Sequence, residues 1–324
     1  MNIARRLNAA SPMKPARRTR NSMLLVVGLC LGSVSCLRAC TVFSDSSEGT
    51  VLAGRNYDGI ANAPAMWFVP AGKGVHGRVC FGRHVGDCQD GMNDQGLFVA
   101  VAAAPPSGRF RSSQMSVSHA AALDGMLASC ATVDEAMAWL KKKPNVLING
   151  SWTTYRFLGL FGKSYGNSGV GGHFLVADKT GRSVVCEWEK GKLKVIRKTG
   201  RYQLITNFLL SKPDAGGSPC PRFAAAKKVL DEVSQPSVAA CAAALEATSG
   251  ELTRYSVVYD LARGDAHVDC RSHFATPKTI HLSEELKKEA HEVNLYAWFG
   301  VNAVEIPREG KVEASTSIPG ADQK

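Results

Sequence analysis

One segment near the start of the chain carries side chains that could do nucleophilic chemistry together. The segment RACTVFSDSSEGTVLAGRNYDG, residues 38–59, places Cys40 fifteen residues before Arg55 and eighteen before Asp58. A cysteine attacks as its thiolate, which a nearby cation favours, and a carboxylate can hold the base that takes the proton. Cys40 therefore has three interpretations: a lipid anchor, a structural thiol at the start of a strand, or a nucleophile exposed by cleavage.

The residues before Cys40 have the composition of a secretory signal. Residues 1–39 contain no acidic residue, seven basic residues and the apolar run MLLVVGLCL. That run is too short to span a bilayer, so we expect the leader to be removed and the protein to be exported, to the periplasm or the extracellular medium. Cleavage after Ala39 would make Cys40 the first residue. Cleavage after Ser35 would leave a short pro-segment, 36–39, to be trimmed.

The net charge argues against nucleic-acid and membrane partners. The whole chain has 39 basic and 28 acidic residues, a charge of +11 with histidine neutral. Without the seven basic residues of the leader, 32 remain against 28, so the mature chain carries only +4. We therefore expect no nucleic-acid partner and no stable membrane insertion after the leader is removed. The sequence leaves the oligomeric state open, including a homo-oligomer.

Eight cysteines remain after the leader, and they form no recognisable metal-binding pattern. An exported chain permits disulfides, but the spacing does not reveal their pairing. If Cys40 is free, at least one other cysteine must also be unpaired. No CxxC motif occurs, and no two histidines stand at metal-ligand spacing. We expect no metal and no cofactor.

Strand-like and helix-like blocks alternate along the chain. The first block is expected to form the strands TVFSDSS, TVLAGRNYD, AMWFVP, GRVCFG and GLFVAVAAA. A second block over 173–207 is typical of an antiparallel meander and contains HFLVAD, SVVCEWE, KLKVIRK and YQLITN. Two or three further strands are expected within 255–282. Helices are expected at about 116–129, from the capping box Thr132–Glu135 onward, at 221–233, at 237–247 and over SEELKKEAHE.

This order of elements predicts an α+β fold in which antiparallel sheets are layered under helices. We expect one domain over residues 40–306. Residues 307–324 are polar and are predicted to be a disordered tail.

A serine hydrolase is the second enzyme interpretation. Residues 162–166, Gly-Lys-Ser-Tyr-Gly, match the Gly-x-Ser-x-Gly pattern with Ser164 as nucleophile. That pattern requires a helix directly after the serine, whereas NSGVGG follows here and disfavours a helix. The histidines stand in no evident relay with a serine or an aspartate, so we assign them no chemistry.

The cleavage interpretation of Cys40 makes a chemical prediction that the other two do not. An N-terminal cysteine carries a thiol and an α-amine, and an α-amine with a pKa of about 7.7–8.0 can take the thiol proton. Such a site also needs a carboxylate for the amine and a donor for the oxyanion. Asp58 could supply the carboxylate and Arg55 the cation that favours thiolate.

At this point the sequence resembles the choloylglycine hydrolase family, which belongs to the N-terminal-nucleophile hydrolases and includes bile salt hydrolases and penicillin V acylases. The resemblance rests on Cys40-Thr41, on GRNYD at 54–58, on GMNDQGL at 91–97, on LITN ending at Asn207, and on SPCPRF with Arg222. It spans roughly residues 40–275. The segment HFLVADKTGRSVVCEW has the shape of the strand pair that precedes the asparagine in that family.

The resemblance implies a role for each matching residue and a four-layer αββα sandwich. Cys40 would be nucleophile and, through its amine, base; Asp58 would anchor the amine and Arg55 would poise the thiol. Asn207 would donate to the oxyanion, and Arg222 would support the electrostatics of the site. One position departs from the family. Ala103 falls where bile salt hydrolases have asparagine and penicillin V acylases tyrosine, which puts both substrates in doubt because alanine offers no side-chain hydrogen bond.

The sequence therefore predicts an exported hydrolase that cleaves a linear, non-peptide N-acyl amide of a small molecule through a thioester. A lipid-anchored binding or structural protein acylated at Cys40 and a serine esterase using Ser164 are the alternatives. The acyl group, the amine, and hydrolysis versus acyl transfer stay open.

Overall fold

The computed structural model describes residues 40–59, 64–104, 117–143, 171–189, 192–213 and 220–301, with the backbone of 146–147. The predicted leader, Ser164 and the predicted tail lie outside these residues, so the structure does not test the expected domain limits.

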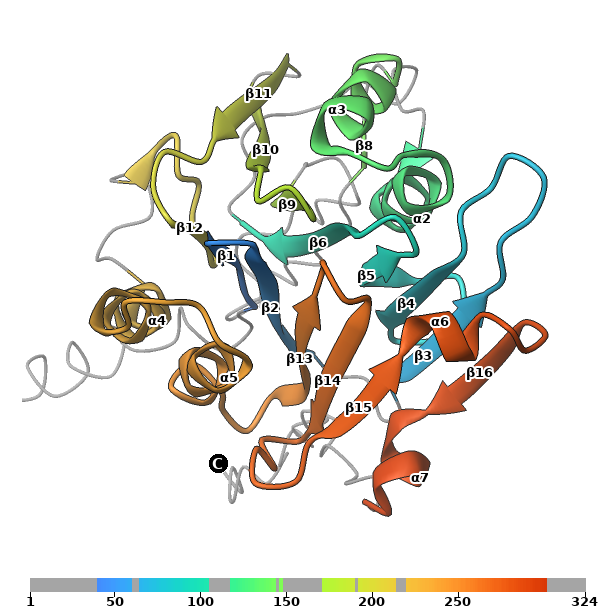
Figure 1. Cartoon of the computed structure of the whole chain (residues 1–324). Helices are drawn as coiled ribbons and strands as arrows, with labels where there is room; N and C mark the ends of the chain where they lie inside the picture. Colours follow the sequence, from blue (N-terminus) through green and yellow to red (C-terminus); the bar gives the residue numbers. More distant parts are fainter. Residues whose placement is uncertain are drawn as a thin grey trace, which may run out of the picture. The chain divides into compact units, whose positions relative to one another are not determined.

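Two antiparallel sheets face each other across the middle of the fold (Figure 1). The first sheet has six strands in the order β12-β1-β2-β13-β14-β15. These are β12 (Tyr202–Ile205), β1 (Thr41–Ser47), β2 (Thr50–Asp58), β13 (Thr253–Asp260), β14 (Asp265–Cys270) and β15 (Lys278–His281).

The second sheet has eight strands in the order β11-β10-β9-β6-β5-β4-β3-β16. These are β11 (Lys192–Arg197), β10 (Ser183–Glu189), β9 (Gly172–Asp178), β6 (Leu97–Ala103), β5 (Cys88–Asn93), β4 (Arg78–Gly82), β3 (Ala65–Val69) and β16 (His291–Asn294). A separate parallel pair joins β7 (Val117–Ser118) to β8 (Val146–Leu147).

Helices cover the outer face of each sheet (Figure 1). Helices α2 (His119–Ser129) and α3 (Val133–Lys141) pack on the eight-stranded sheet through one apolar cluster. Helices α4 (Pro221–Glu232) and α5 (Val238–Glu246) pack on the six-stranded sheet through another. Two short helices, α6 (Leu282–Glu285) and α7 (Leu295–Phe299), follow β15 and β16. The described part of the chain thus has the expected four-layer αββα arrangement, and none of its helices is long and apolar enough to cross a membrane.

The period-two pattern of the strands explains why the sheets can bury both faces. On β1, Val42 faces the core between the sheets, whereas the next residue, Phe43, faces helices α4 and α5. Successive side chains of a strand point to opposite faces. Strands with apolar residues at both parities are therefore suited to the interior of a layered sandwich.

The capping box predicted before α3 is present. The Thr132 hydroxyl accepts the Glu135 backbone N–H at 3.2 Å. The Glu135 carboxylate accepts the Ala131 N–H at 2.6 Å, one residue before the position that the motif specifies. The Thr132 hydroxyl thus satisfies one of the N–H groups that the first turn of a helix leaves without partners.

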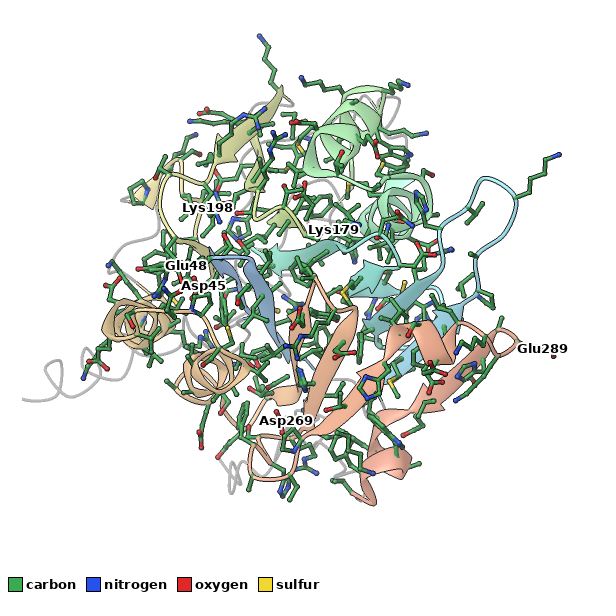
Figure 2. All side chains as sticks on the ribbon, viewed as in Figure 1. Asp45, Glu48, Lys179, Lys198, Asp269 and Glu289 are labelled. Atoms are coloured by element: carbon green, nitrogen blue, oxygen red, sulfur yellow. The ribbon has the colours of Figure 1, made fainter. Side chains whose placement is uncertain are left out.

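Two predictions about elements are wrong. The strand YQLITN is not the fourth strand of the meander, because β12 crosses to the other sheet and pairs with β1, with Val42 opposite Ile205. The crossing is held by charges, since Arg201 lies 3.0 Å from Asp45 and Lys198 is close to the same carboxylate (Figure 2).

The helix expected over SEELKKEAHE is shorter than predicted. Helix α6 ends at Glu285, and β16 begins at His291 and extends the edge of the eight-stranded sheet beside β3. The His291 ring stacks on Phe68 with 4.7 Å between the ring centroids. Pairing with β3 and this ring contact outweigh the intrinsic helix propensity of the segment.

One buried carboxyl group among the described residues has an oxygen without a hydrogen bond, and this group makes stability depend on pH. Asp269 on β14 (labelled in Figure 2) is 3% exposed, and its Oδ1 bonds to none of the described residues. Burial, followed by repulsion from Glu246, raises its pKa from 3.8 to about 7. The folded state therefore holds this proton more tightly than the unfolded chain, so its contribution to stability is complete below pH 3.8 and is lost as the pH rises through 7.

Replacing Asp269 with Asn should remove that loss. At pH 8 we expect the free energy of unfolding of Asp269→Asn to exceed that of the wild type by about 1–2 kcal/mol, and at pH 4 the two should agree within about 0.5 kcal/mol. Urea unfolding at both pH values measures the difference. A gain of equal size at both pH values would mean that the titration of Asp269 is not its cause.

Candidate active site

Cys40 lies directly before the first strand of the six-stranded sheet. Its side chain is 8% exposed and belongs to the core between the sheets. β1 runs between β12 and β2, with Val42 opposite Ile205 and Thr41 opposite Asn56. If both pairings are extended to Cys40, the ends of β12 and β2 lie on either side of it. Asn207 is then on one side and Tyr57 on the other.

Arg55 on β2 is fully buried and forms an ion pair between the two sheets. Its Nε lies 3.3 Å from Oδ1 of Asp90, which is also fully buried and belongs to β5 of the other sheet. The hydroxyls of Tyr255 and Tyr259, both on β13, each donate to the Asp90 carboxylate at 2.7 Å. The Asp90 carboxylate of the eight-stranded sheet thus contacts three side chains of the six-stranded sheet, through one ion pair and two hydrogen bonds.

The groups around Arg55 affect its pKa and that of its partner Asp90. Burial opposes the charge of Arg55, but attraction to Cys40 and Asp90 raises its pKa above the usual value. Burial raises the pKa of Asp90 despite the opposing effects of Arg55 and the two tyrosines. Arg55 is therefore a permanent cation within electrostatic reach of the Cys40 sulfur.

Asp58, at the end of β2, is held by two partners. The Thr253 hydroxyl donates to Oδ1 at 2.7 Å, and Nη1 of Arg222 donates to Oδ2 at 3.2 Å. Burial raises the pKa of Asp58 to about 6, while Thr253, Arg222 and Arg55 pull it in the opposite direction. Arg222 comes from the first turn of α4, so a helix of the outer layer contributes to the same site.

Asn207 follows β12 and is oriented by the end of another strand. Its Nδ2 donates to the carbonyl oxygen of Ala103 at 2.7 Å. This bond uses one of the two N–H groups of the amide. The side chain of Ala103 offers no hydrogen bond, but its backbone carbonyl fixes the direction of Asn207.

The structure places the five residues predicted from sequence at the adjoining ends of β1, β2, β12 and α4. Cys40 is linked to Arg55 by charge, Arg55 to Asp58 by charge, and Asp58 to Arg222 by a hydrogen bond. Asn207 joins them through the register of β12 against β1. The eight described cysteines, Cys40 included, are free thiols. No group of histidine, cysteine and acidic side chains within the described residues could hold a metal ion.

Sequence reasoning missed the carboxylate that holds Arg55. Asp90 lies in CQDGMN, a polar stretch with a glycine that the sequence analysis does not predict as a strand. In the structure this stretch is β5, and all six of its residues are buried. A signal was present, because GMNDQGL had been matched to the family and Asp90 directly precedes it. Thr253 was missed as well, since only the pairing of β13 with β2 places it beside Asp58.

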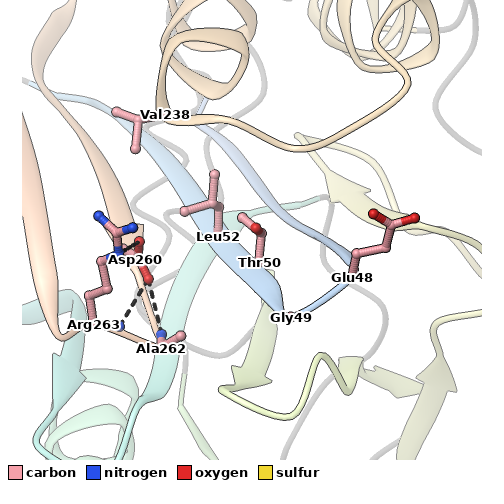
Figure 3. Close-up of a pocket in the computed structure, with 8 residues that line it drawn as sticks. All are labelled: Glu48, Gly49, Thr50, Leu52, Val238, Asp260, Ala262 and Arg263. Carbon is pink, nitrogen blue, oxygen red and sulfur yellow. Dashed lines mark hydrogen bonds and ion pairs between the residues drawn. The ribbon is translucent and has the colours of Figure 1, made fainter.

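A hollow elsewhere on the domain takes no part in this arrangement. It has a volume of about 420 Å³ and lies at the turn between β1 and β2, at the opposite end of β1 from Cys40 (Figure 3). One of its charged lining residues, Asp260, accepts the backbone N–H groups of Ala262 and Arg263 and lies 3.7 Å from the Arg263 guanidinium. The carboxylate thus serves the turn that follows β13.

Comparison with known proteins supports a hydrolase. Residues 73–208 match the model of the linear amide C–N hydrolases, choloylglycine hydrolase family. This range includes Asn207 and Asp90 but begins after Cys40, Arg55 and Asp58. No curated protein matches the chain.

Solved structures confirm the fold. A penicillin V acylase from Agrobacterium tumefaciens is 20% identical, with a TM-score of 0.59, over 82% of this chain and 93% of that one. A mutant of the conjugated bile acid hydrolase from Clostridium perfringens is 16% identical, with a TM-score of 0.59, over 79% of this chain and 96% of that one. The similarity to the choloylglycine hydrolase family and the αββα sandwich, both expected from the sequence, are thereby confirmed, and the family match supports an amidohydrolase.

Proposed function

Since residues 73–208 match the choloylglycine hydrolase family of linear amide C–N hydrolases, we propose that this protein hydrolyses linear N-acyl amides with Cys40 as its nucleophile. Removal of the residues before Cys40 would free its α-amine. The observation that carries the proposal is the position of the thiol, which is buried within electrostatic reach of the permanent cation Arg55 and beside the strand end that bears Asn207.

The first half of the reaction transfers the acyl group to sulfur. The α-amine takes the thiol proton, and the thiolate attacks the carbonyl carbon of the amide. The C–N bond then breaks as the ammonium returns its proton to the leaving amine, which leaves a thioester on Cys40. In the second half, water attacks the thioester, the carboxylic acid departs, and the thiol is restored.

Each neighbouring residue has a role that its contacts support. Asp58 is the last residue of β2, and this end of β2 pairs with the start of β1, so Asp58 is suited to holding the α-ammonium. Arg55 favours the thiolate. The second N–H of the Asn207 amide is suited to the oxygen of the tetrahedral intermediate. Arg222 donates to Asp58 and keeps that carboxylate oriented.

The pKa of Asp58 sets an expected acid limit of activity. Because an ionised Asp58 is needed to hold the ammonium, kcat/KM should fall as the pH drops through about 6. Thr253→Val removes a donor to the charged carboxylate, so the pKa rises and the acid limb should move up by about 0.5–1 pH unit. Thr248→Val, at a buried threonine without a hydrogen bond to Asp58, is the matched control and should leave the limb in place. If the acid limb of the pH profile stayed in place in Thr253→Val, a group other than Asp58 would set it.

The activity can be tested with amides whose acyl groups differ. We propose to measure release of nitroaniline from the p-nitroanilides of phenoxyacetic acid, of a bile acid and of octanoic acid. Hydroxylamine added during turnover would convert a thioester to a hydroxamic acid, and other amines added in its place would reveal acyl transfer. Absence of Cys40-dependent turnover on this set, together with absence of any acylated Cys40 by mass spectrometry, would contradict the proposal.

The burial of Cys40 also bears on its lipid-anchor interpretation. Cys40 is 8% exposed within the core between two sheets, which supports a role as nucleophile over one as the exposed attachment point of a diacylglycerol group. Export through the leader is part of the same proposal, because signal cleavage is what would expose the amine of Cys40. The serine esterase alternative concerns Ser164, outside the described residues.

A further inference from the structure

A buried pair of hydrogen-bonded side chains, one histidine and one glutamate, holds both ends of the segment that carries Asn207. The segment runs from Thr206 to Ser211, directly after β12. His173 on β9 and Glu187 on β10 lie beneath it, and their side chains are 0% and 1% exposed. Neither residue has a role in the mechanism given above.

The contacts divide the segment between the two side chains. At its start, Nε2 of His173 lies 2.7 Å from the carbonyl oxygen of Thr206, the residue before Asn207. At its end, the Glu187 carboxylate accepts the backbone N–H groups of Leu210 at 2.6 Å and Ser211 at 3.1 Å. The two side chains are joined by Nδ1 of His173 and Oε1 of Glu187 at 3.3 Å.

The strand register makes this pair a consequence of the hairpin between β9 and β10. Cys186 is opposite Phe174, so the next step along both strands sets Glu187 opposite His173. On its other side, His173 is opposite Ala102 of β6, the neighbour of Ala103. The strand that holds the histidine therefore also lies beside the carbonyl that receives the Asn207 amide.

The pair is surrounded by hydrogen-bond partners. Both ring nitrogens of His173 face oxygen atoms, one of a carbonyl and one of a carboxylate. Burial acts to raise the pKa of Glu187, but hydrogen bonds from His173 and Ser211 hold it below the usual value. A buried hydrogen-bonded pair of this kind fixes geometry, since breaking any one of its bonds leaves a buried polar group short of a partner.

We propose that His173 and Glu187 are positioning residues that set the Asn207 amide at the distance an oxyanion requires. This inference rests on the proposed amide hydrolysis. It predicts that the pair acts on the turnover rate only through Asn207, because the contacts of both side chains go to the segment 206–211 and to each other.

A double-mutant cycle tests the inference, with the best p-nitroanilide of the three as probe. In Glu187→Gln the side-chain NH₂ group takes the place of one carboxylate oxygen and faces a backbone N–H group. One of the two hydrogen bonds from Leu210 and Ser211 is therefore lost. We expect kcat to fall about 10- to 100-fold, within the loss of about 10²–10³ expected for Asn207→Ala, while KM changes less than about twofold. In the Asn207→Ala background, Glu187→Gln should lower kcat by less than about twofold.

A matched control separates positioning from a general effect on the fold. Asp178 is a buried carboxylate at the other end of β9 and accepts the backbone N–H groups of Val133 and Thr180. Asp178→Asn should lower Tm as Glu187→Gln does but leave kcat unchanged. If Glu187→Gln does not fold, His173→Asn keeps a donor toward Glu187, loses the bond to Thr206, and should lower kcat in the same way.

Three results would overturn the inference: unchanged kcat in the folded variant, full additivity with Asn207→Ala, or an equal loss of kcat in Asp178→Asn. Failure of the proposed function is distinguishable, because turnover that survives Cys40→Ala would exclude the thiol mechanism whatever Glu187→Gln does.

Discussion

Cys40→Ala is expected to lower kcat on a p-nitroanilide substrate by about 10⁴-fold or more, because removal of a nucleophile leaves only binding and oxyanion stabilisation. Folding should be little affected, since alanine fits the space of a small buried thiol. The expected loss is the largest of any single change in the molecule. Cys40→Ser keeps an attacking atom beside the amine, but a hydroxyl is far harder to deprotonate than a thiol, so turnover should be slow and measurable.

A second cysteine provides the control for the loss of a buried thiol. Cys130 is 3% exposed and lies at the end of α2, in the outer layer of the fold. Cys130→Ala should keep full turnover while losing a similar amount of buried sulfur surface. Residual catalysis without the nucleophile does not reach about a tenth of the wild-type kcat. If Cys40→Ala kept more than that, Cys40 would not be the nucleophile.

Asp90→Asn is expected to lower the free energy of unfolding by about 3–5 kcal/mol, the cost of leaving a buried charge without its partner. Arg55 is fully buried, and among the described residues Asp90 is the acidic group with which it forms an ion pair. The amide of asparagine removes that charge and also faces the Tyr255 and Tyr259 hydroxyls with one acceptor in place of two. Urea unfolding measures the loss, and kcat should fall as well, because Arg55 then lacks the contact that directs it.

Tyr259→Phe is the control for the hydrogen-bond part of this loss. It removes one hydrogen-bond donor to Asp90 and keeps the charges of Arg55 and Asp90, so it should lower the free energy of unfolding by about 1–2 kcal/mol. The difference between the two variants then reports the ion pair. If Asp90→Asn cost no more than Tyr259→Phe, the pair between the sheets would contribute little to the fold.

Local signals in the sequence predicted most of the elements and the layered arrangement. The capping box at Thr132 identified the start of α3, and strand-like stretches separated by turn signals identified β1 and β2. These signals depend on a few neighbouring residues, which is why they are visible without the structure. The short α6 was predicted incorrectly because the strand that follows it is stabilised by β3, more than two hundred residues earlier in the chain.

The candidate site was predictable from spacing only where one segment carries several of its residues, whereas Asn207 and Arg222 were predicted from the family resemblance. Arg55 and Asp58 share β2 and could be linked to Cys40 from the spacing alone. Asp90 and Thr253 could not, since each reaches the site through the pairing or packing of strands distant in sequence. The pair of His173 and Glu187 is an intermediate case. The tight turn KTGR sets the hairpin register, and that register places them opposite each other.

The central claim is that Cys40 is the first residue of the active protein, and the N-terminal tryptic peptide tests it most directly. No lysine or arginine lies between Cys40 and Arg55, so a processed chain yields a peptide that begins at Cys40, with a free thiol and a free amine. A chain that retains earlier residues yields Ala39–Arg55, because Arg38 is itself a trypsin site. We predict the Cys40–Arg55 peptide in the exported, active protein. Recovery of Ala39–Arg55 from active protein, or of a Cys40 that carries a diacylglycerol group on its thiol, would contradict the account.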